Sequence, residues 1–253
     1  MTTIGASSQT KKTQTTNAVG LSIIIPVYNE EALLASAIED LNQKLDNLGW
    51  DYELLITENG STDRSQEIIK ELENKYRQIR GLHTDEPNYG LALRRAIKAA
   101  GGTYILCDEI DICDTDFYQR ALAILESEHA DLVIGSKRHP EARDRRPWIR
   151  RLATATVNFL LNILLDFKGT DTHGLKAFHR QRLLPIVDQC IVDKDLFATE
   201  LVIRAQQANY RTIEIPIELE EKRQTPIPLF RRVPKALKQI LRLVAVIRFN
   251  QKV

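Results

Sequence analysis

The sequence predicts an α/β protein with one domain, a mostly parallel central sheet flanked by helices, and a basic helical extension at its C-terminus. Two observations predict this fold class. Short runs of apolar and β-branched residues alternate along the chain with segments whose apolar residues recur at helical spacing. Strands and helices that alternate in this way form right-handed βαβ units, which place parallel strands side by side. The sequence has no internal repeat and no linker, so we expect one domain.

The elements of the first half follow closely on one another. Residues 21–27 (LSIIIPV) are an apolar run of the kind found in strands that are buried on both faces. Asn29 lies in the turn after this run, where we expect it to cap a helix whose apolar residues recur from Leu33 to Leu45. The strands expected next are 52–57, 79–84, 104–107 and 132–135, and the helices between them are 61–76, 91–100 and 116–128.

The pattern changes after Gly135. A basic loop leads into a helix at 148–167, which is followed by a glycine-containing segment, a helix at 196–208, a strand at 212–219 and a basic helix at 234–249. We interpret this half as an elaboration of the same domain. The expected organisation is a disordered leader over residues 1–20, the main domain over 21–230, and a basic amphipathic helix over 231–253 that packs on the domain or on a membrane surface.

The composition limits the class of protein. The net charge of +1 hides an uneven distribution, because residues 222–253 contain nine Lys or Arg and no acid. The basic segments lack a recognisable nucleic-acid-binding module, so we expect no nucleic-acid partner. Three widely spread cysteines indicate a reducing compartment, and no apolar run is long enough to span a membrane. We therefore expect a cytoplasmic protein that is at most peripheral on the cytoplasmic face of a membrane.

The loops at the carboxyl ends of the expected strands are where ligands of such sheets bind. One of them, residues 58–63 (ENGSTD), combines polar side chains with a glycine and a helix N-terminus that can receive negative charge. A turn between a strand and a helix often has this composition, so this loop alone is weak evidence of function.

A second loop of this kind begins at Asp108 and is rich in acids. Neighbouring carboxylates repel one another unless a cation or a proton intervenes. In an extended segment Glu109 and Asp111 point the same way, which favours a magnesium site, since Mg²⁺ takes one or two protein carboxylates together with substrate phosphates. We expect Asp114 and Asp116 to cap the next helix instead.

A series of short motifs runs in order from Leu21 to Arg223. The motifs are SIIIPVYNE at 22–30, ENGSTD at 58–63, Asn88 and Gly90 with Ala92, Ala96 and Gly101, Glu109-Ile110-Asp111, Gly135-Ser136-Lys137, Arg150 with Thr154 and Asn158, Asp171-Thr172-His173-Gly174, and Glu214-Ile215-Pro216-Ile217 before Arg223. This ordered set resembles the motifs of family 2 glycosyltransferases, and within that family those of the polyprenyl-phosphate sugar synthases of the dolichyl-phosphate-mannose type.

The resemblance implies a GT-A-like domain and an inverting transfer of a sugar from a GDP- or UDP-sugar. It also implies that Glu109 and Asp111 hold Mg²⁺ or Mn²⁺, which neutralises the leaving diphosphate. The residues implied to contact the nucleotide sugar are Pro26, Tyr28, Asn29, Glu30, Glu58, Asn59, Glu109, Ile110 and Asn88, the last of which contacts the donor or braces its loop. The residues implied to be catalytic are Asp111, Lys137, Arg150 and Arg223.

The sequence departs from the family pattern at four places. Asn59 and Glu109 stand where the family has aspartates, and Lys137 stands where it has an arginine, which loses bidentate phosphate recognition but keeps the charge. The G-x-S-K segment that usually follows the Arg223 position is replaced by residues 224–228 (QTPIP). These departures concern the donor base, the metal affinity and the acceptor more than the fold.

The acceptor decides whether the enzyme needs a base. A polyprenyl phosphate is already anionic near neutral pH, so it requires cations, for which Lys137, Arg150 and Arg223 are the candidates. A hydroxyl acceptor requires a general base, for which Asp171 and Glu200 are the candidates.

Several alternatives stay open from the residues alone. One is a related enzyme that glycosylates a saccharide or protein hydroxyl, and another is a catalytically silent homologue that binds nucleotide sugars. His173 is expected to have a structural role, while Trp148 lies either at a membrane interface or in the core. A dinucleotide-dependent oxidoreductase is disfavoured, because no G-x-G-x-x-G follows the first strand.

Overall fold

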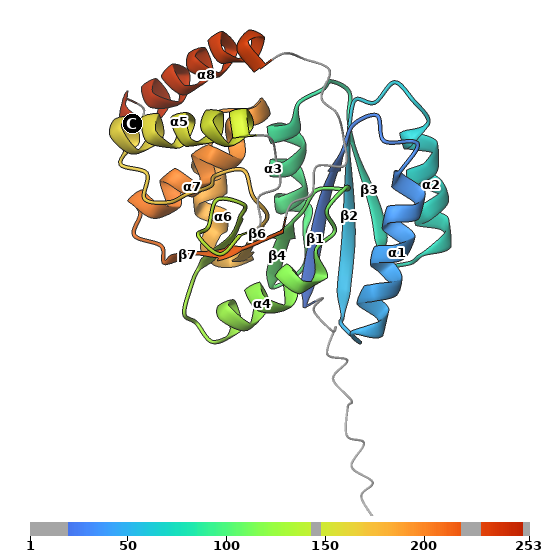
Figure 1. The fold of residues 1–253 in the computed structure, drawn as a ribbon. Helices are drawn as coiled ribbons and strands as arrows, with labels where there is room; N and C mark the ends of the chain where they lie inside the picture. The colour runs from blue at the N-terminus through green and yellow to red at the C-terminus, as the bar shows by residue number, and fades with distance from the viewer. Residues whose placement is uncertain (1–19, 143–147, 219–228, 250–253) are drawn as a thin grey trace, which may run out of the picture.

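The computed structural model describes residues 20–142, 148–218 and 229–249. Figure 1 shows a central sheet with helices on both of its faces. The elements are β1 (Leu21–Val27), α1 (Leu34–Asn47), β2 (Tyr52–Asn59), α2 (Ser65–Lys75), β3 (Ile79–Thr84), α3 (Tyr89–Ala99), β4 (Tyr104–Cys107), α4 (Thr115–Glu126), β5 (Leu132–Ser136), α5 (Trp148–Leu165), β6 (Lys176–His179), α6 (Arg180–Gln189), the 3₁₀ helix η1 (Lys194–Leu196), α7 (Phe197–Gln207), β7 (Thr212–Pro216) and α8 (Leu229–Phe249).

The sheet has seven strands in the order β3-β2-β1-β4-β6-β5-β7. Its pairs are parallel, except that β6 runs antiparallel to both of its neighbours, β4 and β5. The expected fold class, an α/β domain with a mostly parallel sheet and a basic C-terminal helix, is therefore confirmed. The five strands expected before residue 140 are all present, and each begins at the expected residue.

Strand β6 and helix α6 were not expected from the sequence. The strand has only four residues, Lys176–His179, and two of them are polar, so its pattern does not stand out. Helix α6 follows it without a turn and contains Pro185, which weakens a helical signal. Because of β6, strands β4 and β5 are not neighbours, and a strand direction is reversed next to the acidic loop.

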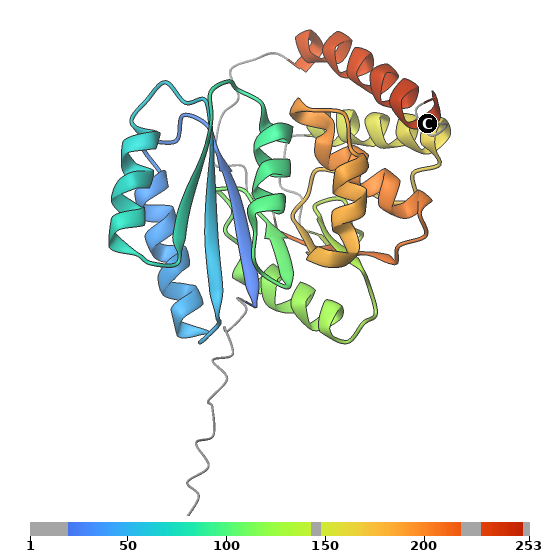
Figure 2. The same cartoon turned by 180° about the vertical axis from the view of Figure 1, so that it is seen from behind.

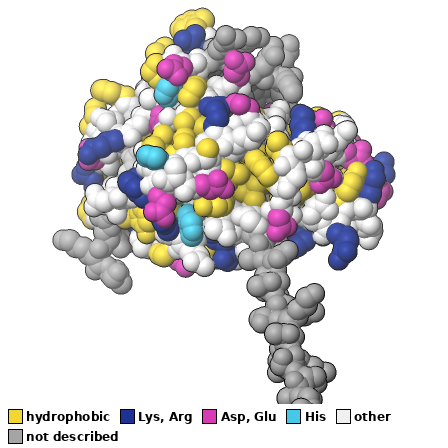
Figure 3. Space-filling model, turned by 90° about the horizontal axis from the view of Figure 1, so that it is seen from below, with side chains coloured by type: hydrophobic (Ala, Val, Ile, Leu, Met, Phe, Trp, Pro, Cys, Tyr) yellow, Lys and Arg dark blue, Asp and Glu magenta, His cyan; other side chains and the backbone are white. Residues whose placement is uncertain are grey.

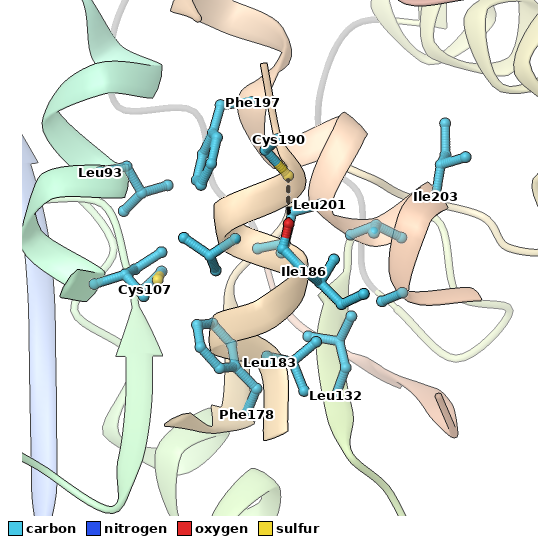
Figure 4. Packing of buried hydrophobic residues seen from close by; sticks show 14 of the residues in the cluster. Leu93, Cys107, Leu132, Phe178, Leu183, Ile186, Cys190, Phe197, Leu201 and Ile203 are labelled. Carbon is cyan, nitrogen blue, oxygen red and sulfur yellow. Dashed lines mark hydrogen bonds between the residues drawn. The ribbon is translucent and has the colours of Figure 1, made fainter. Parts of the chain in front are cut away.

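The two faces of the sheet bury two separate apolar cores. Ile24 belongs to one core, whereas Ile23 and Ile25 belong to the other, as the alternation of side chains along a strand requires. One core packs under α1, α2 and α4, and the other packs under α3, α5, α6, α7 and α8. Figure 4 shows the second core, in which the Cys190 thiol donates a hydrogen bond to the Ile186 carbonyl.

The three cysteines are free, as expected, and Cys107 and Cys190 are buried. Figure 2 shows α5 and α8 side by side, at the end of the molecule towards which β1 and β2 run. Helix α8 begins at Leu229, so it starts earlier than expected and contains Pro234 within its first turns. The leader lies outside the described residues, apart from Gly20.

Candidate active site

A hollow of about 260 Å³ opens at the carboxyl ends of β1, β2 and β4. Such strand ends are the usual ligand sites of open α/β sheets. Seven of the residues that line the hollow were named from the sequence as contacts of the nucleotide or the metal, and Val27 and Tyr89 complete it. The seven are Pro26, Tyr28, Glu30, Asn59, Glu109, Ile110 and Asp111.

A second hollow, of about 720 Å³, lies on the other side of the acidic loop. It is lined by residues 111–116 together with Lys44, Arg120, residues 141–142 and residues 216–218. Among the described residues, Asp111 alone lines both hollows. The side chain expected to be central to catalysis is thus placed where two cavities meet.

Asn29 joins the loop after β1 to the loop after β2 and does not itself line the smaller hollow. Its backbone is left-handed, with φ of 54°, and its amide donates to the Ser61 hydroxyl at 3.0 Å. Its side-chain oxygen accepts from the amide of Thr62 at 2.8 Å. The expectation that Asn29 caps the first helix is therefore wrong, because α1 begins only at Leu34 and Asn29 is used to join two loops.

More hydrogen bonds join the same two loops, which follow β1 and β2. The amide of Glu30 donates to the Ser65 hydroxyl at 2.9 Å, and the amide of Glu31 donates to Asp63 Oδ2 at 3.0 Å. In return the amide of Arg64 donates to Glu31 Oε2 at 3.1 Å. We call these bonds and those of Asn29 the loop clamp, and they explain the Ser, Thr and Asp of the 58–63 motif in structural terms.

Glu58 is also engaged within the protein. Its carboxylate is buried, accepts from the amide of Ser61 and from Gln66 Nε2, and contacts His83 Nδ1. These partners orient the turn that carries Asn59. In the structure Glu58 therefore shapes the loop, and Glu58 is not among the residues that line either hollow.

Asn59 and Asn88 link the end of β2 to the start of α3 through consecutive hydrogen bonds. Asn59 Oδ1 accepts from the amide of Asn88 at 2.5 Å. Asn88 Oδ1 in turn caps α3, because it accepts from the amides of Leu91 at 3.1 Å and Lys194 at 2.8 Å. Of the two roles considered for Asn88, the structure shows the bracing one.

The acidic loop is a turn and not an extended segment. The amide of Ile112 donates to the carbonyl of Glu109 at 3.0 Å, which closes the turn, and the Ile110 side chain is buried beneath it. The expectation that Glu109 and Asp111 share a face of an extended strand is therefore wrong. The turn nevertheless brings both residues to the same hollow.

Asp108 supports this turn from below and was not singled out from the sequence. Its buried carboxylate accepts from the Tyr118 hydroxyl at 2.5 Å and from the amides of Glu109 at 2.5 Å and Asp114 at 3.0 Å. Burial raises the pKa of Asp108 to about 7, although these hydrogen bonds act in the opposite direction. Asp114 caps α4 as expected, whereas Asp116 pairs with Arg120 at 2.8 Å and is not a cap.

The Glu109 and Asp111 carboxylates fit a divalent cation. Protein atoms crowd Glu109 and raise the pKa of its carboxyl, and the charge of Asp111 raises it further. A cation between them would relieve this repulsion. No group of three or more His, Cys, Asp or Glu side chains forms a metal site within the described ranges, so substrate phosphate and water would supply the other ligands, as is usual for Mg²⁺.

Lys137 pairs with Asp171 beside this loop. The Lys137 Nζ lies 3.2 Å from Asp171 Oδ2, and both side chains are largely buried. Burial by itself would raise the pKa of Asp171, but the charge of Lys137 and a hydrogen bond from the amide of His173 outweigh it and lower the pKa. Lys137 acts electrostatically on Glu109 of the acidic loop, but its ammonium already has a carboxylate partner, and its expected role with a phosphate stays a prediction.

Three motif segments converge on Thr170, next to Asp171. Glu214 accepts from the amide of Thr170 at 2.7 Å and from its hydroxyl, and the Ser136 hydroxyl lies 2.6 Å from that hydroxyl. Asn158 donates to the Thr170 carbonyl. These motifs, which lie far apart in the sequence, therefore form a brace that fixes the 170–174 loop.

Lys176 is a buried cation that sequence reasoning missed. It is the first residue of β6, its Nζ donates to the Gly174 carbonyl at 2.7 Å, and it is 3% exposed. The motif Asp171–Gly174 could have drawn attention to it, because the long side chain of a lysine two residues after that motif can reach back to the same loop. It was overlooked because β6 itself was not expected.

The other candidates lie elsewhere. Arg150 is on α5, but its side chain is not described, and Arg223 lies outside the described residues. Glu200 is fully buried on α7, where it accepts from the amides of Ile191 and Val192 and from Arg204 Nε. His173 is exposed, and so is Trp148, which excludes core packing for that tryptophan.

A comparison with known proteins shows to which family this chain belongs. The family model described as "Glycosyl transferase family 2" matches residues 22–185, more than half of the chain. The chain belongs to glycosyl transferase family 2. The matched range begins at β1 and ends in α6, so it contains both loops of the clamp, the acidic loop and the Lys137–Asp171 pair. The resemblance inferred from the ordered motifs is thereby confirmed at the level of the family.

The chain is also similar in sequence to curated glycosyltransferases. The chain is 29% identical to the glycosyltransferase AglD of Haloferax volcanii over 233 residues, which is 90% of this chain and 37% of that protein. It is 28% identical to the undecaprenyl-phosphate 4-deoxy-4-formamido-L-arabinose transferase of Edwardsiella ictaluri, covering 80% of this chain and 60% of that protein. The chain thus spans less than two thirds of the length of these relatives.

Solved structures share the fold. Glucosyl-3-phosphoglycerate synthase from Mycobacterium tuberculosis, in complex with Mn²⁺, UDP and glucosyl-3-phosphoglycerate, superposes with a TM-score of 0.62 over 89% of this chain and 78% of that one. The complex of the same enzyme with phosphoglyceric acid gives a TM-score of 0.66. The identities are 17% and 19%, so this similarity shows the fold alone, which is GT-A-like.

Proposed function

We propose that this family 2 glycosyltransferase transfers a sugar from a nucleoside-diphosphate sugar to a polyprenyl phosphate, with inversion and with the help of a divalent cation. The observation that carries the proposal is the position of Asp111 between the two hollows. The smaller hollow, to which the loop clamp contributes Glu30, would hold the nucleotide, and the larger one would receive the acceptor side. The sugar–diphosphate bond would then lie beside Asp111.

The proposed reaction is a substitution at the anomeric carbon of the sugar, in which negative charge develops on the leaving diphosphate. An oxygen of the acceptor attacks the anomeric carbon of the sugar, and the bond from that carbon to the diphosphate breaks with its electron pair on the diphosphate. A divalent cation held by Glu109 and Asp111 would neutralise the charge that develops on this leaving group. The residues of the chain hold the donor, orient the acceptor and keep the two carboxylates together.

The described residues favour a phosphate acceptor over a hydroxyl. A hydroxyl needs a general base with a pKa near the working pH, but the pKa of Asp171 is lowered and its carboxylate is paired with Lys137. Glu200 has three donors of its own and lines neither hollow. A phosphate needs no base, and the relative from Edwardsiella ictaluri is named as an undecaprenyl-phosphate transferase.

Helices α5 and α8 supply a surface for a lipid acceptor. Eight of the eleven large apolar side chains that are exposed among the described residues lie on these two helices. They are Trp148, Ile149, Leu152, Phe159 and Ile163 on α5, and Leu237, Leu241 and Phe249 on α8. Within the described part of the chain, none of the helices combines the length and apolarity that crossing a bilayer requires.

The charges of this surface complement an anionic bilayer. Neither α5 nor α8 contains an acid, and exposed Lys238, Arg242 and Arg248 lie among the apolar residues of α8. By contrast, Figure 3 shows acidic and basic side chains interspersed on the face seen from below in Figure 1. We propose that α5 and α8 lie on the membrane surface, with apolar side chains among the lipid headgroups and basic ones beside anionic lipids.

Replacement of Leu241 by Asp should release the protein from vesicles. Burial of one leucine in the lipid contributes roughly 1.5–3 kcal/mol, so we expect the vesicle affinity of Leu241→Asp to fall at least about tenfold. Co-sedimentation with vesicles of phosphatidylcholine and phosphatidylglycerol measures this. The matched control is Leu48→Asp, which changes an exposed leucine after α1. Equal vesicle binding by both variants would contradict the proposed surface, and so would vesicle binding that does not depend on the anionic lipid.

A direct assay tests the proposed reaction. The purified protein is incubated with a panel of GDP- and UDP-sugars and a short polyprenyl phosphate, with Mg²⁺ or Mn²⁺ or with a chelator. We expect one donor to give a glycolipid, detected by mass spectrometry, and the chelator to abolish it. Transfer only to saccharide or protein hydroxyls would replace the lipid acceptor, whereas binding of a nucleotide sugar without any turnover would indicate a silent homologue.

A further inference from the structure

Charges of alternating sign lie at and around the proposed metal site, and two of them, Asp171 and Lys176, are buried. Glu109 and Asp171 are the acids and Lys137 and Lys176 are the bases, and we call these four residues the charge cluster. Lys137 Nζ is 3.2 Å from Asp171 Oδ2, and Lys176 Nζ is 2.7 Å from the Gly174 carbonyl, within the loop that Asp171 opens. Each acid acts electrostatically on both lysines.

Lys176 cannot serve as a flexible surface clamp. It is 3% exposed and lies in the middle of the sheet, paired with Cys107 on β4 and with Ile134 on β5. Burial lowers the pKa of Lys176, while the charges of Asp171 and Glu109 counteract that effect. Burial also raises the pKa of the Cys107 thiol to about 12, so this neighbour is neutral near pH 7. The acids that face Lys176 are therefore those of the site.

We propose that Lys176 is a fixed internal cation that weakens the binding of a divalent ion by the free enzyme. The inference rests on the metal role proposed above for Glu109 and Asp111. The buried charge of Lys176 acts on Glu109, one of the two carboxylates, so it also repels a divalent cation held there, and the low-dielectric surroundings strengthen that repulsion. The ion would then be held well only together with the diphosphate of the donor, whose oxygens complete its ligands.

This arrangement suits a transferase that must release its product. A site that binds the ion tightly by itself would also retain the metal–diphosphate product. Lys176 acts through the carboxylates and not on the substrate, so it is a positioning residue. Lys137 is 14% exposed and forms an ion pair with Asp171, whereas Lys176 is 3% exposed and lies within the sheet.

The test is the affinity of the protein for Mn²⁺ alone, measured from the electron paramagnetic resonance signal of free Mn²⁺ without nucleotide. We expect Lys176→Met to lower the dissociation constant about tenfold, because it removes a positive charge and keeps the apolar stem. Asp171→Asn should raise it, because Lys137 and Lys176 lose their counter-charge. Lys176→Arg, which keeps the charge, should remain close to wild type.

The opposite signs separate an electrostatic role from a structural one. If Lys176 only held the loop through Gly174, Lys176→Met would weaken Mn²⁺ binding or leave it unchanged, and either result would overturn the inference. Lys98→Met, which removes an exposed lysine paired with Asp188, is the control and should change nothing. Thermal melting shows which variants fold, and if Lys176→Met does not fold, Lys176→Gln, which removes the charge but keeps a donor for the Gly174 carbonyl, takes its place with the same expected result.

A second readout comes from the transfer reaction. Lys176→Met should need less Mn²⁺ for half-maximal rate and should have a lower kcat, because the metal–diphosphate product leaves more slowly. A loss of activity with an unchanged Mn²⁺ requirement would contradict the inference. If the wild-type protein binds no Mn²⁺ at all, the metal site proposed for Glu109 and Asp111 is itself wrong, and the inference falls with it.

Discussion

Asp111→Asn is expected to abolish sugar transfer while the protein stays folded. Asp111 lines both hollows and carries one of the two carboxylates of the proposed metal site. The amide keeps the shape of the side chain but loses the charge, so the leaving diphosphate loses its bound cation. Removal of one such electrostatic contribution lowers the rate by about two to three orders of magnitude, and we expect at least that loss in kcat.

The measurement compares glycolipid formation with Mn²⁺ affinity in the same preparation. Asp188→Asn is the matched control, because it makes the same change on α6, in an exposed pair with Lys98 that touches neither hollow. We expect this control to retain the wild-type rate within about twofold, since exposed ion pairs contribute little. Full activity of Asp111→Asn in the presence of chelator would remove both the catalytic and the metal role from this residue.

Gly174→Ala is expected to cause the largest loss of stability. A Cβ at position 174 would lie 1.8 Å from the carbonyl oxygen of Gly135, a backbone atom that is held in the sheet. The adjacent bond from the Gly135 amide to the Leu175 carbonyl, 2.8 Å long, ties β5 to the start of β6. The methyl group can be accommodated only if these strands separate, so we expect a loss of about 3–5 kcal/mol in the free energy of unfolding.

Urea unfolding followed by circular dichroism measures this loss. Gly101→Ala is the control, because its Cβ would meet only Glu53 Oε1 at 3.5 Å, which is an ordinary contact. We expect a change of less than about 1 kcal/mol there. A Gly174→Ala protein as stable as wild type would show that β5 and β6 are packed less closely than the structure describes.

Much of the fold could be predicted because its first half follows strong local patterns. Strands such as Leu21–Val27 are continuous apolar runs, and the helices between them have regular apolar faces. Strand β6 could not be predicted in this way. Its residues 176–179 pair with strands that lie about 70 and 45 residues earlier, and such long-range pairing leaves no local signal.

Several residues named from the sequence line one hollow, but their roles there stay predictions. Glu109 and Asp111 are two of them, because strand ends fix where the loops meet. The roles of Asn29, Glu58 and Asn88 depend on which atoms their side chains reach, and those partners are 3 to about 106 residues away in the sequence. Spacing within a motif cannot show such partners, so binding and bracing residues looked alike.

The loop clamp has a consequence for how the donor is recognised. Its hydrogen bonds tie the loops after β1 and β2 to each other in the free protein. Binding that must first order a loop loses conformational entropy, and this loss reduces the affinity. Because the clamp is already formed, a nucleotide bound in the smaller hollow as proposed would meet neighbouring loops of fixed shape. Donors should therefore be discriminated on this side by shape complementarity and not by an induced rearrangement of these loops.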